Sequence, residues 1–320
     1  MKLTEENEED IPEFPETFFV DYVKLTHFVA GVSGGVASTL ILHPLDLLKI
    51  RFSVCDDRTP DRKHLGLKQT VQSIYRTEGW EGFFKGAYPN FFGCGLSWGF
   101  YFLFYSDLKS LMQGGDATKD IGPFKHMLAA STAGAVTLAL TNPIWVTKTR
   151  LCLQQQQNKN PQLHYAGMRD CMAKICEEEG FRGLYKGFLP GLLGVSHGAI
   201  QFMIYEEFKS SSNVRQGRPI NSQLDTKEYI LYAAVSKVIA SSLTFPYQVI
   251  RSRLQDQHRR YRGFKHCVKL TYDREGWKGF YKGLTPSLIR VVPSTIITFV
   301  AYENISSFLR SKWTSHENEA

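Results

Sequence analysis

The stretch Pro44–Arg51 reads PLDLLKIR, and the same arrangement of residues occurs twice more in the chain. The second copy, PIWVTKTR, spans Pro143–Arg150, and the third, PYQVIRSR, spans Pro246–Arg253. Successive prolines are 99 residues (44 to 143) and 103 residues (143 to 246) apart. Units of soluble solenoid proteins are typically about 20–45 residues long, so this longer period predicts a different architecture.

A second element follows each copy of the first. It reads EGWEGFFKG, EGFRGLYKG and EGWKGFYKG, at residues 78–86, 179–187 and 275–283. Three ordered copies of both elements indicate three internal repeats. We place these repeats at residues 21–118, 119–220 and 221–312, which together form one integral domain, with a C-terminal tail at 313–320.

Each repeat contains two moderately apolar stretches that are rich in small residues, one before the proline and one after the Lys-Gly step. With its flanks each stretch is about 20 residues long, enough for a helix to span roughly 30 Å of hydrocarbon. No uninterrupted apolar run of about 18 residues occurs, which fits helices whose polar residues face a water-filled cavity. The segments near 66–77, 167–178 and 263–274 predict short amphipathic helices along the membrane surface.

Proline inside a helix removes a hydrogen-bond donor and clashes with the preceding turn, so it kinks the helix. Pro44, Pro143 and Pro246 occupy equivalent places and predict three kinks at one depth. Such kinks would draw the three helices together at one end of a funnel. The predicted fold is therefore an all-α membrane protein with six transmembrane helices in three pseudo-symmetric repeats and three short surface helices.

The charge of the chain is unevenly distributed. Residues 1–20 hold seven acids and one base, so of 38 bases and 31 acids the remaining residues hold 37 and 24. The acidic start has neither an Arg-rich transit sequence nor an apolar signal core, and it predicts a disordered tail without a cleavable presequence. The basic remainder fits nucleic acid, anionic lipid or anionic solutes. Nucleic-acid binding would not require kinked apolar spans, so we expect no nucleic-acid partner.

Cysteine spacing and the lack of catalytic motifs argue against an enzyme or a metalloprotein. None of the six cysteines forms a CxxC pair, so we expect single reduced thiols and neither zinc nor disulfides. No nucleophile–base set or metal cluster stands out, and the glycine-rich segments lack the lysine step of a phosphate-binding P-loop. The sequence therefore predicts a protein that is not an enzyme, uses no cofactor and holds no metal.

The two repeated elements resemble the signature of the mitochondrial carrier family, and the resemblance covers about residues 22–311. That family has Pro-x-[Asp/Glu]-x-x-[Lys/Arg]-x-[Lys/Arg], then [Asp/Glu]-Gly, four residues, an aromatic residue, [Lys/Arg] and Gly, three times over. The resemblance implies a multi-pass monomer of the mitochondrial inner membrane, with the surface helices in the matrix and alternating access to one central site. It also implies cardiolipin as a structural lipid at the Lys-Gly steps, where helix starts offer free backbone donors.

Two departures from the family pattern make the sequence resemble one subgroup of the family more than the others. The first repeat matches fully with Asp46 and Lys49, whereas Trp145 and Gln248 stand where the family usually has acids. The tryptophan resembles the subgroup that carries folate, FAD, NAD and pyrimidine nucleotides, and both residues together most resemble the folate and FAD carriers. The implied cargo is tetrahydrofolate and/or FAD moving into the matrix. NAD or a pyrimidine nucleotide is the alternative cargo, and a non-transporting receptor or scaffold is the alternative function.

The resemblance also implies two layers of contacts that gate the central site. On the matrix side the expected contacts are Asp46 with Lys148, Trp145 with Arg251 as a cation–π contact, and Gln248 with Lys49 as a hydrogen bond. Gln255, one turn after Arg251, would brace this layer. The alternative is that these residues only satisfy one another at helix ends.

On the cytoplasmic side, a second motif places aromatic, acidic and basic residues near the ends of the even-numbered helices. Cyclic pairing there joins Lys109 with Glu206 and Lys209 with Glu303. The third contact would join two serines, where both partners have lost their charge together. No ion is then stranded in a desolvated contact, which would cost roughly several kcal/mol.

Two cations at mid-span are the strongest candidates for the substrate site, because ionisable residues there are costly and usually functional. Arg290 matches the sixth-helix contact position of the family, and Lys237 shares a helix face with Ser241. For Lys237 the alternative is snorkelling to the membrane interface. By family position further contacts fall near Gly93 and Leu193-Gly194, with Trp98 and His197 nearby. These cations predict an anionic small-molecule substrate, which Arg290 would hold bidentately.

Overall fold

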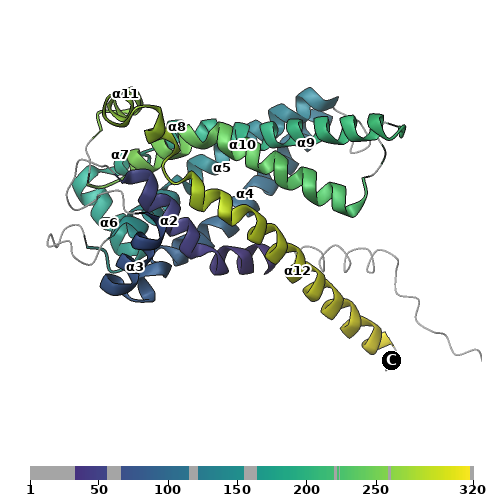
Figure 1. Ribbon diagram of the computed structural model, residues 1–320, viewed down its shortest axis with the longest axis horizontal. Coiled ribbons are helices and arrows are strands. Elements are labelled where there is room, and N and C mark those ends of the chain that lie inside the picture. The colour runs from purple at the N-terminus through teal and green to yellow at the C-terminus, as the bar shows by residue number, and fades with distance from the viewer. Residues whose placement is uncertain are drawn as a thin grey trace, which may run out of the picture. The chain divides into compact units, whose positions relative to one another are not determined.

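A computed structural model describes residues 33–55, 66–114, 122–154, 164–219, 222, 224–258 and 261–317, and within these ranges all regular structure is helical (Figure 1). The predicted acidic tail at 1–20 lies outside the described residues. The chain forms two compact units, one of residues 38–295 and one of residues 1–37 with 296–320. The features described below belong to the first unit unless a helix is said to continue beyond it.

The proline-bearing helix of each repeat is long in repeats two and three and interrupted in repeat one. In the first repeat, helical residues 33–41 are followed by a turn at Leu42 and by α2 (His43–Val54). In the others, α5 (Gly122–Leu153) and α10 (Thr226–Gln255) continue as helices through Pro143 and Pro246. The interruption lies beside Pro44, which has no N–H to continue the helical hydrogen bonding.

The second long helix of each repeat begins after the Lys-Gly step. These helices are α4 (Ala87–Gln113), α8 (Phe188–Leu193) continued by α9 (Val195–Arg215), and α12 (Leu284–Glu317), which extends into the second unit. The glycine before each start has a positive φ, 79° at Gly86, 75° at Gly187 and 91° at Gly283, which L side chains rarely adopt. A one-residue turn at Gly194 separates α8 from α9, but its φ of −65° and ψ of −23° stay helical, so the fourth span predicted from the sequence continues through it.

Three twelve-residue helices follow the proline-bearing helices, as the sequence predicts. They are α3 (Leu67–Glu78), α6 (Met168–Glu179) and α11 (Phe264–Glu275), each followed by one short turn of helix, η2 (Glu81–Phe84), α7 (Phe181–Leu184) and η4 (Trp277–Tyr281). Figure 1 shows them at one end of the unit. Each packs on its own repeat through a small apolar core, which in the second repeat contains Val146, Ile175 and Leu184.

A carboxylate ends each of these surface helices and binds two cations of its own repeat. The first cation is the last arginine of the proline motif: Arg51 to Glu78, Arg150 to Glu179 and Arg253 to Glu275, all at 2.7 Å. The second is the lysine of the Lys-Gly step: Lys85, Lys186 and Lys282, at 2.7, 2.9 and 3.1 Å from the same glutamates. Each triplet therefore fastens the proline-bearing helix, the surface helix and the start of the next long helix together.

The Lys-Gly steps also join each repeat to the next. An ideal Cβ at Gly86 would lie 2.8 Å from Sγ of Cys152, and one at Gly283 would lie 2.7 Å from the carbonyl oxygen of Lys49. At Gly187 the corresponding atom would lie 3.1 Å from the carbonyl oxygen of Arg251. Repeat one thus meets repeat two, repeat two meets repeat three, and repeat three returns to repeat one. These contacts close a ring with threefold pseudo-symmetry.

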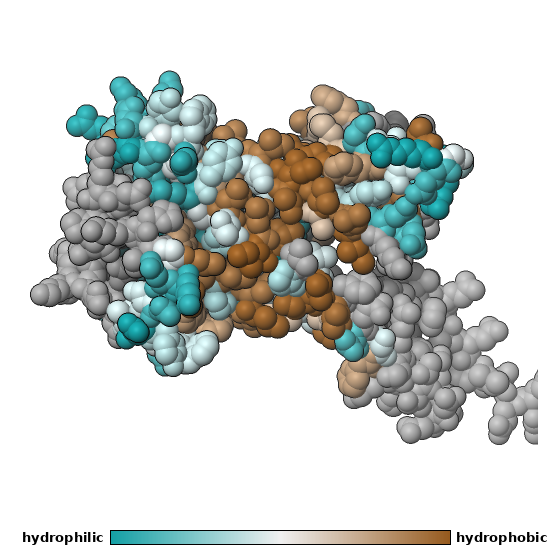
Figure 2. Space-filling model, in the orientation of Figure 1, coloured by the Kyte–Doolittle hydropathy of each residue, from teal (hydrophilic) through white to brown (hydrophobic). Residues whose placement is uncertain are grey.

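Apolar side chains cover the outside of the long helices. Phe102, Leu140 and Leu243 are more than half exposed although they lie near the middle of α4, α5 and α10. On the face shown in Figure 2, hydrophobic atoms gather over the middle of the described unit and hydrophilic atoms at its ends. Among the described helices three are long and apolar enough to cross a membrane, at Phe124–Leu153, Phe181–Arg215 and Glu228–Gln255. Such an exterior fits a lipid environment.

The three glutamate triplets differ in burial, which gives a matched test of their contribution to stability. Glu275 is 3% exposed and binds Arg253 at 2% exposure, whereas Glu179 is 22% exposed. Removing one partner of a buried ion pair costs about 3–5 kcal/mol. We expect Glu275→Gln to lower the apparent Tm in detergent clearly more than Glu179→Gln. The exposed Glu81→Gln is the control, and equal losses at positions 275 and 179 would contradict the argument.

Burial raises the pKa of Glu78, but the hydrogen bonds and positive charges of Arg51 and Lys85 together lower it by more than burial raises it. The pKa of Glu78 therefore lies below its ordinary value. A glutamate with a lowered folded-state pKa stabilises the fold above its unfolded pKa, and this stabilisation is lost as the pH falls through the folded pKa. The Tm difference between the wild type and Glu78→Gln should therefore stay constant from about pH 8 to pH 6 and shrink below about pH 4.5. Thermal unfolding across this range measures it, and a difference that grows in acid would refute the assignment.

Candidate functional site

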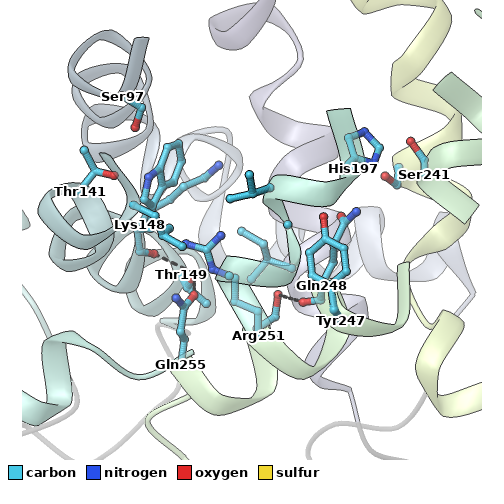
Figure 3. Close-up of a pocket in the computed structure, with 18 of the residues that line it drawn as sticks. Ser97, Thr141, Lys148, Thr149, His197, Ser241, Tyr247, Gln248, Arg251 and Gln255 are labelled. Carbon is cyan, nitrogen blue, oxygen red and sulfur yellow. Dashed lines mark hydrogen bonds between the residues drawn. The ribbon is translucent and has the colours of Figure 1, made fainter. Parts of the chain in front are cut away.

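A cavity of about 560 Å³ lies inside the unit of residues 38–295. All three repeats contribute to its lining, through residues of α4, α5, α8, α9, α10 and the first part of α12. Figure 3 shows Lys148 and Thr149 on one side, Tyr247 and Gln248 on the other, and Arg251 between them. We refer to this space as the central cavity.

Positive charge dominates the lining of the central cavity. Four cations contribute to it: Lys148, Lys237, Arg251 and Arg290. None of the described lining residues is an aspartate or a glutamate. Lys237 and Arg290, both predicted from the sequence as substrate contacts, therefore line one space together with Ser241. A low-dielectric cavity with this charge favours anions.

The nearest acid lies behind the lining. Asp46 of α2 is 6% exposed, and its Oδ2 lies 3.6 Å from Nζ of Lys148 on α5. Its other oxygen, Oδ1, lies 2.9 Å from Nη1 of Arg290 on α12. The structure thus brings Asp46 and Lys148 together, as expected from the family resemblance. It adds Arg290 as a second cation on the same carboxylate, which the sequence did not indicate.

Two glutamines complete the contacts at the proline end of the cavity. Nζ of Lys49 donates to Oε1 of Gln248 at 2.7 Å, the pair expected from the sequence. Gln255 is 2% exposed, and its Oε1 accepts a hydrogen bond from Oγ1 of Thr149 at 2.6 Å. Its Nε2 donates to the carbonyl oxygen of Lys186 at 3.3 Å. Gln255 therefore links α10 to α5 and to the Lys-Gly step of the second repeat, while its gating role stays a prediction.

The expected cation–π contact between Trp145 and Arg251 is not formed among the described residues. The cation over the Trp145 ring is Lys148, 5.3 Å from the ring centroid and three residues further along the same helix. The Arg251 side chain instead packs against α8, where an ideal Cβ at Gly191 would lie 3.4 Å from its Cζ. Its Nη2 is buried without a hydrogen-bond partner. Among the described residues no acid pairs with Arg251, so it adds to the positive charge of the cavity.

The small residues predicted at the site lie at different depths. Gly194 lines the cavity beside the Tyr247 ring, whereas Leu193 is 51% exposed and does not line it. Gly93 lies behind the lining, and an ideal Cβ there would be 3.6 Å from Cζ2 of Trp145. The tighter contact of that Cβ would be with Cγ2 of Ile144, at 3.0 Å, so Gly93 lets α4 approach this turn of α5 closely, and its role as a substrate contact stays a prediction.

Of the two nearby aromatic candidates, one lines the cavity. Nδ1 of His197 lies 2.9 Å from Oγ1 of Thr244, and the imidazole is part of the lining. Trp98 is 63% exposed and stacks on Phe102 of its own helix, outside the cavity lining. Tyr247 was missed from the sequence. Tyr247 lies between Pro246 and Gln248, and Gln248 was already predicted to belong to the proline-end layer. That position could have indicated that Tyr247 lies near the cavity.

Comparison with known proteins identifies the family of this chain. The sequence pattern of the mitochondrial carrier protein family matches residues 22–116, 119–214 and 222–313. The chain belongs to the mitochondrial carrier protein family. It is 38% identical over 301 residues to folate transporter 1, chloroplastic, of Arabidopsis thaliana, covering 90% of this chain and 96% of that protein.

Two further relatives are similar at nearly full length. The chain is 35% identical to nicotinamide adenine dinucleotide transporter 1, chloroplastic, of Arabidopsis thaliana, covering 89% of this chain and 92% of that protein. It is 32% identical to mitochondrial FAD carrier protein FLX1 of Saccharomyces cerevisiae, covering 87% and 94%.

Family membership confirms the predicted fold class, six transmembrane helices in three repeats with three surface helices. Members of this family are transporters rather than enzymes, and they move small anionic or nucleotide-like substrates. The carrier's sequence-based recognition as a relative of folate and FAD carriers is confirmed by the relatives that carry those names.

The opposite end of the carrier shows no cross-helix ion pair among the predicted residues whose side chains are described. Nζ of Lys209 lies 3.7 Å from Oε2 of Glu206, three residues apart on α9, and the expected pair of Glu206 with Lys109 is not formed. The side chain of Glu303 lies outside the described residues. The cyclic pairing at this end therefore stays a prediction.

Gly194 gives a test of the cavity wall. An added Cβ would lie 2.8 Å from the carbonyl oxygen of Gly191 and 3.3 Å from the Tyr247 ring, so Gly194→Ala should push that ring into the cavity. Overpacking typically costs about 1–3 kcal/mol. We expect a lower Tm and a several-fold lower uptake in proteoliposomes. Gly198→Ala, where nothing lies within 4 Å, is the matched control, and equal behaviour of the two variants would reject the assignment.

Proposed function

We propose that this carrier moves folate, as tetrahydrofolate, and/or FAD across the mitochondrial inner membrane into the matrix by alternating access. The observation that carries the proposal is the central cavity itself, with four cations and no acid among its described lining residues. Trp145, Tyr247 and His197 add aromatic faces to the same lining. The combination suits a substrate that joins a planar ring system to an anionic group.

Both cargo molecules have this composition. Folate carries a pteridine ring and the carboxylates of a glutamate, and FAD carries an isoalloxazine ring and a pyrophosphate. Arg290 would bind either anionic group bidentately, since its planar guanidinium matches carboxylate and phosphate oxygens. Lys237 would provide a second positive charge nearby, and the aromatic residues would stack on the ring.

The gates of the proposed cycle are the two layers of contacts at the ends of the cavity. At the proline end, Asp46 with Lys148, Lys49 with Gln248, and the brace Gln255 join neighbouring repeats. At the opposite end, Glu206 pairs within its own helix. In the proposed cycle the proline-end layer is the gate towards the surface helices, and the residues of the cyclic pairing form the opposite gate. Alternating access would exchange these two arrangements.

The relatives also bear on the alternatives. One is named as a nicotinamide adenine dinucleotide transporter, so NAD remains the alternative cargo, together with pyrimidine nucleotides. A non-transporting receptor or scaffold of the same fold is the alternative from another class. The four cations that line the cavity speak against that role, because a scaffold gains nothing from a cavity lined with like charges.

The surroundings of the proposed transporter follow from the family. We propose the mitochondrial inner membrane as its location, a monomer as its working unit, and no cofactor or metal. Cardiolipin is the proposed structural lipid, with the backbone donors at the Lys-Gly steps binding its phosphates. Two of the relatives named above are chloroplastic, so fractionation of the organelles tests the location directly.

Uptake into liposomes holding purified carrier tests the cargo. We expect labelled 5-formyltetrahydrofolate (a stable reduced folate) or FAD to be taken up, and NAD and UTP to be taken up poorly. Arg290→Ala should lower uptake by at least about tenfold, since charge-assisted hydrogen bonds contribute about 1.5–3 kcal/mol. Lys68→Ala, an exposed lysine on α3, is the control for loss of positive charge alone.

The outcomes separate the candidate functions. Selective uptake of NAD or UTP would keep the transporter and overturn the folate and FAD assignment. No uptake of any of the four compounds by folded protein would favour the receptor or scaffold. Uptake of folate or FAD that does not depend on Arg290 would show that other residues of the cavity bind the substrate.

A further inference from the structure

One carboxylate holds two cations that have different places in the carrier. Asp46 contacts Lys148 at 3.6 Å and Arg290 at 2.9 Å, and so joins α2, α5 and the first part of α12. The shorter contact is the one with Arg290, which also lines the central cavity. Repeats two and three have Trp145 and Gln248 at the position of Asp46. Asp46 is therefore the acid of this layer that faces a cavity cation.

The burial of the two partners is unequal. The Asp46 side chain is 8% exposed, whereas the Arg290 side chain is 31% exposed and borders the cavity. An anion entering the cavity thus reaches the guanidinium while the carboxylate stays behind it. The entering anion and Asp46 carry the same charge, and Asp46 already holds Nη1 of the one guanidinium that both would bind. Both cannot use Nη1 of Arg290 fully, so their binding competes.

We propose that Asp46 is an internal counter-anion of the substrate site, which holds Arg290 until an anionic substrate takes the guanidinium from it. This inference rests on the proposed function, since it takes Arg290 as the residue that binds the anionic substrate and names Asp46 as the anion that competes for it. When the substrate binds Arg290, Asp46 keeps its longer contact with Lys148. The layer at the proline end thereby loses one of the two ion pairs on Asp46.

The exchange links cargo binding to the gate without stranding a charge. Arg290 replaces the carboxylate of Asp46 by an anionic group of the substrate, and Asp46 keeps one cation. A ligand shifts a conformational equilibrium only by its difference in affinity for the two states. An anion that engages Arg290 gains most in the state where Asp46 has released it. A neutral ring compound of the same size has no such difference and should bind without loosening this layer.

Removing the competitor should tighten the binding of anions, an outcome that loss of a purely structural contact does not produce. We expect Asp46→Asn to bind 5-formyltetrahydrofolate or FAD about tenfold more tightly than the wild type, because one charge-assisted hydrogen bond no longer has to be exchanged. Lys148→Gln is the matched control. It removes the other partner of the same gate contact and leaves the competitor on Arg290, so it should not tighten binding.

The measurement is equilibrium binding to the purified full-length carrier in detergent, on variants that keep a cooperative thermal unfolding transition. Asp46→Asn leaves Lys148 without its carboxylate, so the double variant Asp46→Asn/Lys148→Gln provides a second test with that charge also removed. Asp46→Asn should bind more tightly than the wild type, and the double variant should bind more tightly than Lys148→Gln. Unchanged or weaker binding in either comparison, or equal tightening by Lys148→Gln alone, would overturn the proposal.

Inorganic pyrophosphate, added as a third probe, separates this inference from the choice of cargo. Tighter pyrophosphate binding by the Asp46 variants, without binding of folate or FAD by any protein, would support the counter-anion and reject the proposed cargo. Folate or FAD binding that is equal in all variants would support the cargo and reject the counter-anion.

Discussion

The ion pairs of the carboxylate at the end of each surface helix are the interaction on which the rest of the carrier depends. Each one binds an arginine from the proline motif and a lysine from the Lys-Gly step of the same repeat. Two of these arginines also reach a neighbouring repeat, since Nε of Arg51 donates to the carbonyl oxygen of Cys152, and Nε of Arg253 to that of Ser53. One ionic cluster therefore determines both the shape of a repeat and the place where repeats meet.

The ion-pair triplets are the same in all three repeats, whereas the residues that surround the cavity differ between repeats. The frame uses the same glutamate, arginine and lysine in all three repeats, whereas the position of Asp46 holds a tryptophan and a glutamine in the others. A symmetric frame positions these residues at one level around the cavity, but it does not require them to differ. We therefore propose that the carrier distinguishes its substrate at the equivalent positions that differ.

The elements that depend on spacing were predictable, and those that depend on side-chain direction were not. The surface helices and the pairing of Lys49 with Gln248 follow from motif positions. The Trp145–Arg251 contact was wrong, because Lys148 lies one helical turn from the ring and reaches it without crossing between helices. The Arg290–Asp46 pair was missed, since cyclic pairing of motifs considers only the equivalent positions and Arg290 belongs to another helix.

Charge balance gives a physical reason for preferring one cargo class. Asp46 offsets only part of the positive charge of the four cavity cations, so a substrate with more than one negative charge fits better than a nearly neutral one. NAD offsets part of its pyrophosphate charge with the nicotinamide cation, whereas the glutamate of folate and the pyrophosphate of FAD have no such compensation. A pyrimidine nucleotide has ample charge but only one small ring. Trp145, Tyr247 and His197 all line the cavity, and the larger fused rings of folate and FAD would reach more of them than a single pyrimidine ring would, which supports the proposed cargo.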